Sequence, residues 1–308
     1  MHRYFHMIWL LSFLWTLNAL CHAEPHPDRI IFLSDTQDPL WFERLILSGN
    51  SNVEASELIL NQIIREDVAA IFHLGDMVSI GYDQEGWYRI DQFLLQLKKR
   101  QIPLYATLGN HELFLFPDHG AEAFMKRFPA YEPRGYLVRV GPAAIIILNS
   151  NFGYPDDDQI TQQQTWYEHV LDSCQQDSSI RTIIVGCHHP PFTNSKIVSP
   201  NEDVQRFLLP GFIRNSKTKL FLSGHSHAFE HFSEYGKDFM VIGGGGGLQH
   251  PLALGNEAKY KDHFSGPDKR GFHFLTCVVT GDSLKVNINM VTEDLSGVEV
   301  IYSIDIGY

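Results

Sequence analysis

Short apolar runs rich in β-branched residues alternate with segments of helical periodicity along the first two thirds of this 308-residue chain. In the segment 84–100, apolar side chains recur at i, i+3, i+4 and i+7, which places Ile90, Phe93, Leu94 and Leu97 on one face of a helix. The other expected helices are 54–65, 160–174 and 204–215, and the expected strands are 29–34, 68–74, 102–108, 143–148, 182–187 and 219–223. This alternation predicts a layered α/β fold.

The chain after Gly224 is rich in strand-like runs and lacks helical periodicity. The runs are 230–235, 239–243, 272–280, 284–291 and 298–305, and the earlier segment 136–148 has the pattern of a hairpin. We expect the late strands to form a second, largely antiparallel sheet that packs on the first. The expected fold class is therefore α/β, with two packed mixed β-sheets flanked by helices in an α/β/β/α sandwich. No repeat or linker divides the chain, which indicates a single domain.

Residues 1–23 differ in character from the rest of the chain. His2 and Arg3 precede the apolar run 7–20, and the small residue Ala23 closes the segment, a pattern typical of a secretory signal peptide. We therefore expect an exported protein, periplasmic or secreted, with a signal peptide at 1–23 and a functional domain at 24–308. A retained anchor is the weaker alternative, because the run is shorter than the roughly 20 residues of a spanning helix. Lipid attachment at Cys21 is disfavoured by the bulky Leu20 before it.

The remaining chain is acidic. Removal of residues 1–23 would also remove Arg3 and change the formal net charge from −12 to −13. Nucleic acid is therefore not an expected partner. No other segment is long and apolar enough for stable membrane insertion, and the oligomeric state cannot be read from the sequence. An oxidising compartment permits one disulfide, for which Cys174 and Cys277 are candidates, whereas Cys187 lies in an apolar run and is expected to be a buried thiol.

Candidate ligand side chains follow five of the expected strands. The strand-end sequences are Asp35-Thr36-Gln37, Gly75-Asp76, Gly109-Asn110-His111-Glu112, His188-His189 and Gly224-His225-Ser226-His227. Because the carboxyl ends of parallel strands line one crevice, these groups are expected to meet. Mixed oxygen and imidazole donors favour Zn, Mn or Fe, and a carboxylate such as Asp76 can bridge two ions through its two oxygens.

Each strand-end sequence has an ordinary structural alternative when it is taken alone. A Gly-Asp pair is common in turns, as Gly281-Asp282 of the same chain illustrates, and His188-His189 before two prolines can simply end a strand. The Gly243–Gly247 run suggests a phosphate-binding loop, but no clear helix follows it, so close backbone packing is the preferred interpretation. The ordered set of five, each placed after a strand, is what indicates a metal site.

These residues resemble the blocks of the calcineurin-like metallophosphoesterase superfamily, which run D-x-H, G-D, G-N-H-D/E, H and G-H-x-H. The resemblance spans about residues 35–247 and is closest to small secreted purple-acid-phosphatase-like members. Four blocks match, and the first departs because Gln37 stands where the superfamily has a histidine. Ser79 replaces the tyrosine expected three residues after Asp76, which implies that the enzyme is not purple.

The resemblance implies a dinuclear site with two divalent or mixed-valence transition metal ions (Fe, Mn or Zn). By position, the first metal has the ligands Asp35, Gln37 and His227, the second has Asn110, His188 and His225, and Asp76 bridges them. His111 is implied to be a catalytic residue that stabilises the phosphoryl transition state or protonates the leaving oxygen, with Glu112 as its orienting partner. His189 is left free to contact substrate.

The implied function is hydrolysis of phosphate monoesters on a small phosphorylated substrate, by attack of a metal-bound hydroxide. One alternative keeps the metals and makes the substrate a diester, a cyclic nucleotide or a pyrophosphate. Another is a non-catalytic relative that binds a phosphorylated ligand, for which Gln37 is the only support. The segments 114–120, 151–158 and 248–270 are expected to be loops that wall the pocket and set specificity.

Overall fold

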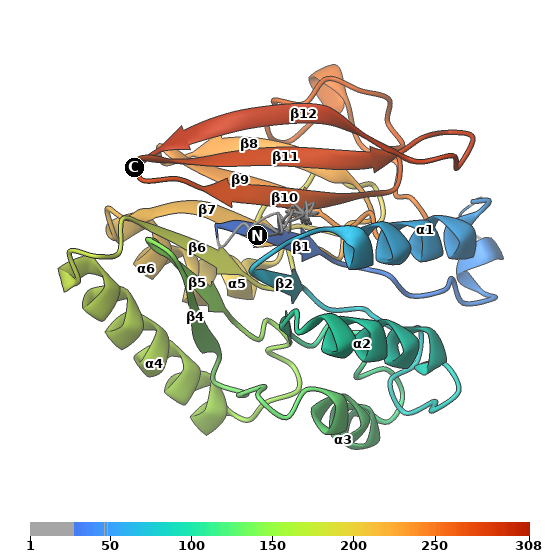
Figure 1. Cartoon of the computed structure of the whole chain (residues 1–308), viewed down its shortest axis with the longest axis horizontal. Coiled ribbons are helices and arrows are strands. Elements are labelled where there is room, and N and C mark those ends of the chain that lie inside the picture. Colours follow the sequence, from blue (N-terminus) through green and yellow to red (C-terminus); the bar gives the residue numbers. More distant parts are fainter. Residues whose placement is uncertain (1–27, 46, 48) are drawn as a thin grey trace, which may run out of the picture.

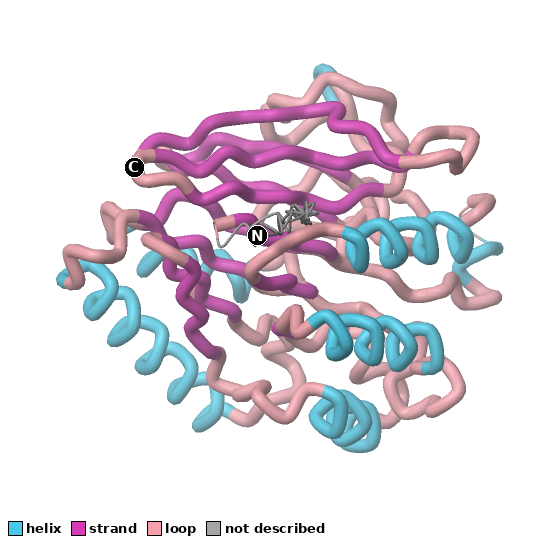
Figure 2. Tube along the Cα trace, viewed as in Figure 1, coloured by secondary structure: helices cyan, strands magenta, loops and turns pink. Residues whose placement is uncertain are grey.

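Two six-stranded sheets form the centre of the molecule (Figures 1 and 2). This computed structural model describes residues 28–45, 47 and 49–308, so the expected signal peptide lies outside the described residues. One sheet has the order β12-β11-β10-β1-β2-β3 and the other the order β4-β5-β6-β7-β9-β8. The strands are β1 Arg29–Leu33, β2 Ala70–His73, β3 Leu104–Ala106, β4 Tyr136–Val140, β5 Ala143–Ile147, β6 Thr182–Gly186, β7 Thr218–Ser223, β8 Phe229–Glu234, β9 Lys237–Ile242, β10 His273–Val279, β11 Ser283–Val291 and β12 Val298–Gly307.

Helices cover the outer face of each sheet, as Figure 1 shows. The α-helices are α1 Asn52–Arg65, α2 Tyr88–Arg100, α3 Pro117–Arg127, α4 Asp157–Gln176, α5 Glu202–Phe207 and α6 Leu209–Arg214, with short 3₁₀ turns at Glu43–Leu45 and Gly255–Glu257. The first three pack on the sheet that contains β1, and the last three pack on the sheet that contains β6. The α/β/β/α arrangement and the single domain predicted from the sequence are confirmed.

The alternating faces of β1 explain this layering. Ile30 and Phe32 point into the core between the sheets, whereas Ile31 and Leu33 pack against the helices, and all four side chains are fully buried. Strands buried on both faces read as continuous apolar runs rather than as an alternation of apolar and polar residues. That is the pattern from which the early strands were predicted.

The partition of strands between the sheets differs from the expectation. The late strands do not form a sheet of their own, because β10, β11 and β12 extend the β1 sheet through antiparallel pairing of β1 with β10. In the other sheet β9 runs parallel to β7, and β8 pairs with β9. Hydrophobic periodicity specifies which face of a strand is buried but not which neighbour it pairs with. The sequence therefore predicted two mixed sheets, but it did not predict which strands belong to each sheet.

Two helix assignments also need correction. The segment 114–120 was expected to be a loop, but α3 begins at Pro117 and buries Ala121, Ala123 and Phe124 on one face. The expected helix 204–215 is two helices, because Pro210 has no backbone N–H to continue the hydrogen bonding of α5. The segment 248–270 is a long loop, as expected, apart from the 3₁₀ turn.

The cysteines of the described chain are free thiols. Cys277 lies in the core between the sheets, whereas Cys174 and Cys187 lie in the core under α4, α5 and α6. The candidate disulfide between Cys174 and Cys277 is therefore not formed, because the two sulfurs belong to different layers. Within the described part of the chain, no helix has the length and apolar character needed to span a membrane.

A buried carboxyl group ties β8 to the loop that follows β6. Glu230 is fully buried and accepts hydrogen bonds from Thr193 Oγ1 at 2.5 Å and from the Asn194 backbone N–H at 2.7 Å. Burial is the main cause that raises the pKa of Glu230 to about 7, from an ordinary value of 4.5. Between about pH 4.5 and pH 7, the Glu230 carboxyl of the folded protein therefore keeps its proton, whereas the unfolded chain has released it.

Because the folded state binds more protons in this window, its stability should fall as the pH rises from about 4.5 to 7. Glu230→Gln removes this titration and keeps an acceptor for Asn194. We expect the variant to gain stability relative to the parent between pH 5 and pH 8, by on the order of 2–3 kcal/mol, measured by chemical denaturation. Glu299→Gln, at an exposed position on β12, is the matched control and should show no such change. A constant difference between variant and parent at both pH values would contradict the assignment.

Candidate functional site

Five strands from both sheets end at one edge of the sandwich. The strands β1, β2 and β3 are parallel neighbours in one sheet, and β6 and β7 are parallel neighbours in the other. Their carboxyl ends carry all the residues singled out from the sequence: Asp35, Gln37, Asp76, Asn110, His111, His188, His225 and His227. The ligand residues thus come together from the strand ends of two sheets, rather than along one open sheet as the sequence argument assumed.

The backbone turns sharply at three of these strand ends. Asp35, Asp76 and His225 have φ values of 61°, 55° and 65°, in the left-handed region that costs a non-glycine residue about 1–2 kcal/mol. Such conformations persist where the surroundings hold them in place, and they concentrate at functional sites. Gly224 permits the turn at His225, because a Cβ atom there would collide with the side chains of Ser34 and Asp35.

One group of donor atoms consists of Asp35, Gln37 and His227. His227 Nε2 lies 3.4 Å from Asp35 Oδ1. The Gln37 amide is oriented by its neighbours: when its nitrogen donates to the Asp35 and Asp76 carbonyl oxygens, at 3.2 and 2.9 Å, its oxygen lies 3.2 Å from His227 Nε2. The amide oxygen of Gln37 therefore faces the same point as the aspartate and the imidazole.

A second group consists of Asp76, Asn110, His188 and His225. His188 Nε2 lies 3.2 Å from Asp76 Oδ2 and 3.0 Å from Asn110 Oδ1. The rings of His188 and His225 are 5.0 Å apart between centroids. Asp76 Oδ1 accepts the His111 backbone N–H at 2.8 Å, and Oδ2 faces His188. Bridging of two ions by Asp76 stays a prediction.

The two groups adjoin. Ligand atoms of Asp35, Asp76 and His188 all lie within 4.8 Å of one another. Donor atoms 3.0–3.4 Å apart have the spacing of neighbouring corners in a coordination shell with bonds of about 2.0–2.2 Å. The residues present therefore fit a pair of transition metal ions, with oxygen and imidazole ligands in each half.

Backbone carbonyl groups fix the orientation of two imidazoles. His188 Nδ1 donates to Leu74 O at 2.9 Å, and His227 Nδ1 donates to Leu248 O at 2.8 Å. Each ring therefore presents Nε2 to the cluster, the arrangement by which protein metal ligands are usually oriented. Gly247 leaves room for the His227 ring, which a Cβ atom at that position would strike, and this supports the expected close packing of the Gly243–Gly247 run.

The carboxylates favour positive charge on two imidazoles of the cluster, whereas burial and the neighbouring imidazoles lower the pKa of His225. Burial opposes protonation of His188, but Asp76, with smaller contributions from Asp35 and Glu112, raises its pKa to about 9. Burial also opposes protonation of His227, and its hydrogen bond to Asp35 outweighs that effect and raises the pKa. Burial would raise the pKa of Asp76, but the charge of His188 lowers it overall. A bound cation would satisfy the same demand.

Glu112 does not orient His111, contrary to the sequence expectation. Its buried carboxylate accepts backbone N–H groups of Asp76, Met77 and Gly109, at 2.9, 2.6 and 2.7 Å. Burial, followed by the charge of Asp76, raises the pKa of Glu112 to about 7, although these N–H groups act in the opposite direction. Glu112 therefore joins the turn after β2 to the turn after β3.

A backbone carbonyl group takes the place of Glu112 beside the His111 ring. His111 Nδ1 donates to Ser79 O at 2.9 Å, and Nε2 lies 3.8 Å from Glu43 Oε1. The ring is only partly buried, and among the described residues it forms no hydrogen bond or ion pair with a side chain of either donor group. The backbone of Ser79 thus has a role that its side chain did not suggest.

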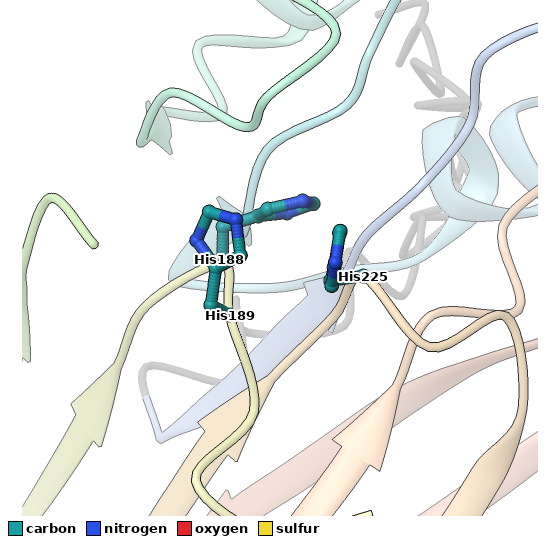
Figure 3. Close-up of side chains that lie close together, drawn as sticks. All are labelled: His188, His189 and His225. Atoms are coloured by element: carbon teal, nitrogen blue, oxygen red, sulfur yellow. The ribbon is translucent and has the colours of Figure 1, made fainter. Parts of the chain in front are cut away.

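Three more residues lie close to these donor groups: His189, which the sequence left free to contact substrate, and Ser150 and His250, to which it gave no role. The His189 ring lies 4.8 Å from that of His188 and 4.6 Å from that of His225, and Figure 3 shows the three rings together at the ends of two strands. Ser150 Oγ lies 2.9 Å from His189 Nδ1. His250 stacks on His227 with centroids 4.4 Å apart. His189 was identified from its place next to His188, whereas nothing in the sequence marks Ser150 or His250.

The comparisons with known proteins agree with this arrangement. A family model described as calcineurin-like phosphoesterase matches residues 28–229, well over half of the chain. The chain belongs to this family. Probable purple acid phosphatase 20 of Arabidopsis thaliana is 26% identical over 230 residues, which cover 68% of this chain and 51% of the plant protein. The chain thus spans about half the length of that relative.

Solved structures show the same fold at low identity. Purple acid phosphatase PPD1 from yellow lupin (Lupinus luteus) superposes with a TM-score of 0.64 at 17% identity, covering 91% of this chain and 53% of the lupin chain. GAP50, described as the anchor in the inner membrane complex of Plasmodium, has a TM-score of 0.64 at 15% identity, covering 91% and 88% of the two chains. These likenesses establish the fold and leave the activity to the residues of the site.

The role of Glu112 can be tested by Glu112→Gln. The amide keeps one acceptor oxygen but turns an NH₂ group toward backbone donors, which leaves buried N–H groups unpaired at about 1–3 kcal/mol each. We expect a lower melting temperature and at least about tenfold weaker metal retention, as second-sphere changes typically cause. Glu57→Gln, at an exposed position on α1, is the control. Unchanged stability and metal content in Glu112→Gln would show that the two turns hold without the carboxylate.

Proposed function

We propose that this protein is a metal-dependent phosphoesterase that hydrolyses phosphate monoesters at a dinuclear centre. The observation that carries the proposal is the pair of adjoining donor groups, with the His111 ring beside them and outside both. Membership of the calcineurin-like phosphoesterase family and the likeness to a probable purple acid phosphatase support it. Small phosphorylated molecules are the proposed substrates.

The two donor groups described above would supply the ligands of the two metal ions. Asp35, Gln37 and His227 would hold one ion, and Asn110, His188 and His225 would hold the other, with Asp76 between them. When bound, two transition metal ions (Fe, Mn or Zn) would neutralise phosphoryl oxygens and supply a water of lowered pKa as the nucleophile, which avoids a phosphoenzyme.

The chain's own residues would position the phosphoryl group and assist departure of the alcohol. The P–O bond to the alcohol breaks, the alcohol oxygen takes a proton, and phosphate leaves with the oxygen of water. His111 would supply this proton, because its Nδ1 is hydrogen-bonded to Ser79 O, which leaves Nε2 for the substrate.

Non-catalytic binding of a phosphorylated ligand is the second candidate, because Gln37 replaces an expected imidazole. Metal content after dialysis separates the two proposals: fewer than about one ion per chain would favour the binding protein. Hydrolysis of diesters or pyrophosphate on the same site is separated by comparing rates on these substrates with rates on monoesters. The exported location expected from residues 1–23 remains a prediction, to be tested by N-terminal sequencing of the secreted protein.

We expect chelated protein to regain hydrolysis of p-nitrophenyl phosphate when Mn, Zn or Fe is added.

His111→Ala should lower kcat by about 10²–10⁴-fold without loss of metal, because its ring lies outside both donor groups. Asp76→Asn should lose metal and activity together. His169→Ala, at an exposed position on α4, is the control for histidine loss. No hydrolysis with any of the three metals would overturn the proposal.

Gln37 makes the first metal site the weaker one. A neutral amide oxygen binds Zn or Fe less strongly than an imidazole nitrogen, so Gln37→His should slow the loss of one ion during dialysis against a chelator. Elemental analysis over time measures this effect, and the second ion serves as the internal reference. If the variant changes neither metal retention nor rate, Gln37 is not a ligand, while the hydrolase proposal stands.

A further inference from the structure

A pocket of about 360 Å³ opens beside the proposed metal centre. Asn110 and His189 form the side shared with the centre, and the loop that follows β5 forms much of the remaining wall. The start of α5 contributes Asn201 and Asp203. The pocket is therefore the adjoining space into which the alcohol part of a bound phosphate ester can extend.

Buried amide groups hold the wall of this pocket in place. Gln163 of α4 accepts the Asn149 backbone N–H at 2.9 Å and donates to Asn149 O at 2.8 Å. Asn151 donates to Leu108 O at 2.9 Å and to Asn149 Oδ1 at 3.0 Å, which ties the loop to the segment that follows β3. A satisfied polar network of this kind makes a pre-formed surface rather than an adaptable one.

The residue between the centre and the pocket is also held in place. Ser150 Oγ lies 2.9 Å from His189 Nδ1 and accepts the His189 backbone N–H at 2.9 Å. Both His189 and Asn151 line the pocket, and within the described chain His189 Nε2 and Asn151 Oδ1 form no hydrogen bond. They offer polar contacts suited to hydroxyl or ring-nitrogen groups.

The charge of the pocket limits what can enter. No Lys or Arg is among the described residues that line it, and Asp203 is its only carboxylate. Phe152 and Tyr154 add ring surface; Phe152 is backed by Phe207 at 5.2 Å between centroids, and the Tyr154 hydroxyl donates to Asp118. A second phosphate on the substrate would be repelled by the Asp203 carboxylate, and no lysine or arginine among the described lining residues would offset this repulsion.

We propose that this pocket selects phosphate monoesters whose alcohol is uncharged and carries a ring, the class to which nucleoside monophosphates belong, and that it disfavours alcohols with a further phosphate. This inference rests on the proposed function and specifies its substrate class. Phe152 and Tyr154 provide the surface for the ring, and Asp203 provides the discrimination against additional negative charge.

Three substrates test the two parts of the proposal separately. Adenosine 5′-monophosphate is compared with adenosine 3′,5′-bisphosphate, which adds one phosphate, and with ribose 5-phosphate, which lacks the base. With metal-loaded full-length protein, we expect kcat/KM for the monophosphate to exceed that for each of the others by about tenfold or more, the range that one well-placed contact gives. Equal values for all three would overturn the proposal.

Two variants assign the effect to the pocket. Asp203→Lys should reduce the penalty for the bisphosphate several-fold, and Tyr154→Ala should reduce the advantage of the monophosphate over ribose 5-phosphate. Asp172→Lys, an exposed change of equal charge near the far end of α4, is the control and should alter neither ratio. If Asp203→Lys and Asp172→Lys behave alike, the pocket does not set the charge preference.

Hydrolysis of p-nitrophenyl phosphate by the same preparation distinguishes the two possible failures. If this aryl ester is hydrolysed and the three substrates are not discriminated, the pocket inference fails and the proposed function stands. If the aryl ester and all three substrates resist hydrolysis with Mn, Zn and Fe, both fail.

Discussion

The site depends on a carboxylate that contacts backbone N–H groups. Glu112, buried between the ends of β2 and β3, accepts N–H groups on both sides and so fixes the turn that carries Asp76 relative to the turn that carries Asn110. Without an acceptor there, several buried donors would lose their partners, and the left-handed conformation of Asp76 would lack support. A residue that faces away from the reaction thereby sets the separation of those that face it.

Hydrogen bonds between side chains and backbone groups also orient the other ligands of the cluster. Each half contains an imidazole whose Nδ1–H is committed to a carbonyl oxygen, so that Nε2 must face the carboxylates. The backbone N–H of His225 in turn contacts Asp35, which connects the sheet of β7 to the sheet of β1. The donor groups are held by backbone atoms of both sheets, and the proposed metals would enter a site whose ligands are already oriented.

Much of this could be predicted because the relevant signals are local. The continuous apolar runs identified the strands, and polar residues directly after them identified the edge where Asp35, Asn110 and His227 meet. Contacts that join distant segments left no such signal. The position of Glu112 beside His111 suggested the wrong partner, because adjacency along the chain does not specify the direction of a side chain. The link between Ser150 and His189 was invisible for the same reason.

The sequence by itself determined most of the elements, the fold class and the order of the ligand blocks, since burial periodicity and residue chemistry act over a few positions. The tertiary structure decided which strands pair, that α3 is a helix, and that the ligand residues come from the strand ends of two sheets. It also decided that Gln37 faces His227 and that a pocket whose described lining has no lysine or arginine lies beside Asn110. These outcomes follow from packing and hydrogen bonding between residues far apart in the sequence, such as Gln37 with His227 and Arg29 with Val278, and no local pattern encodes such contacts.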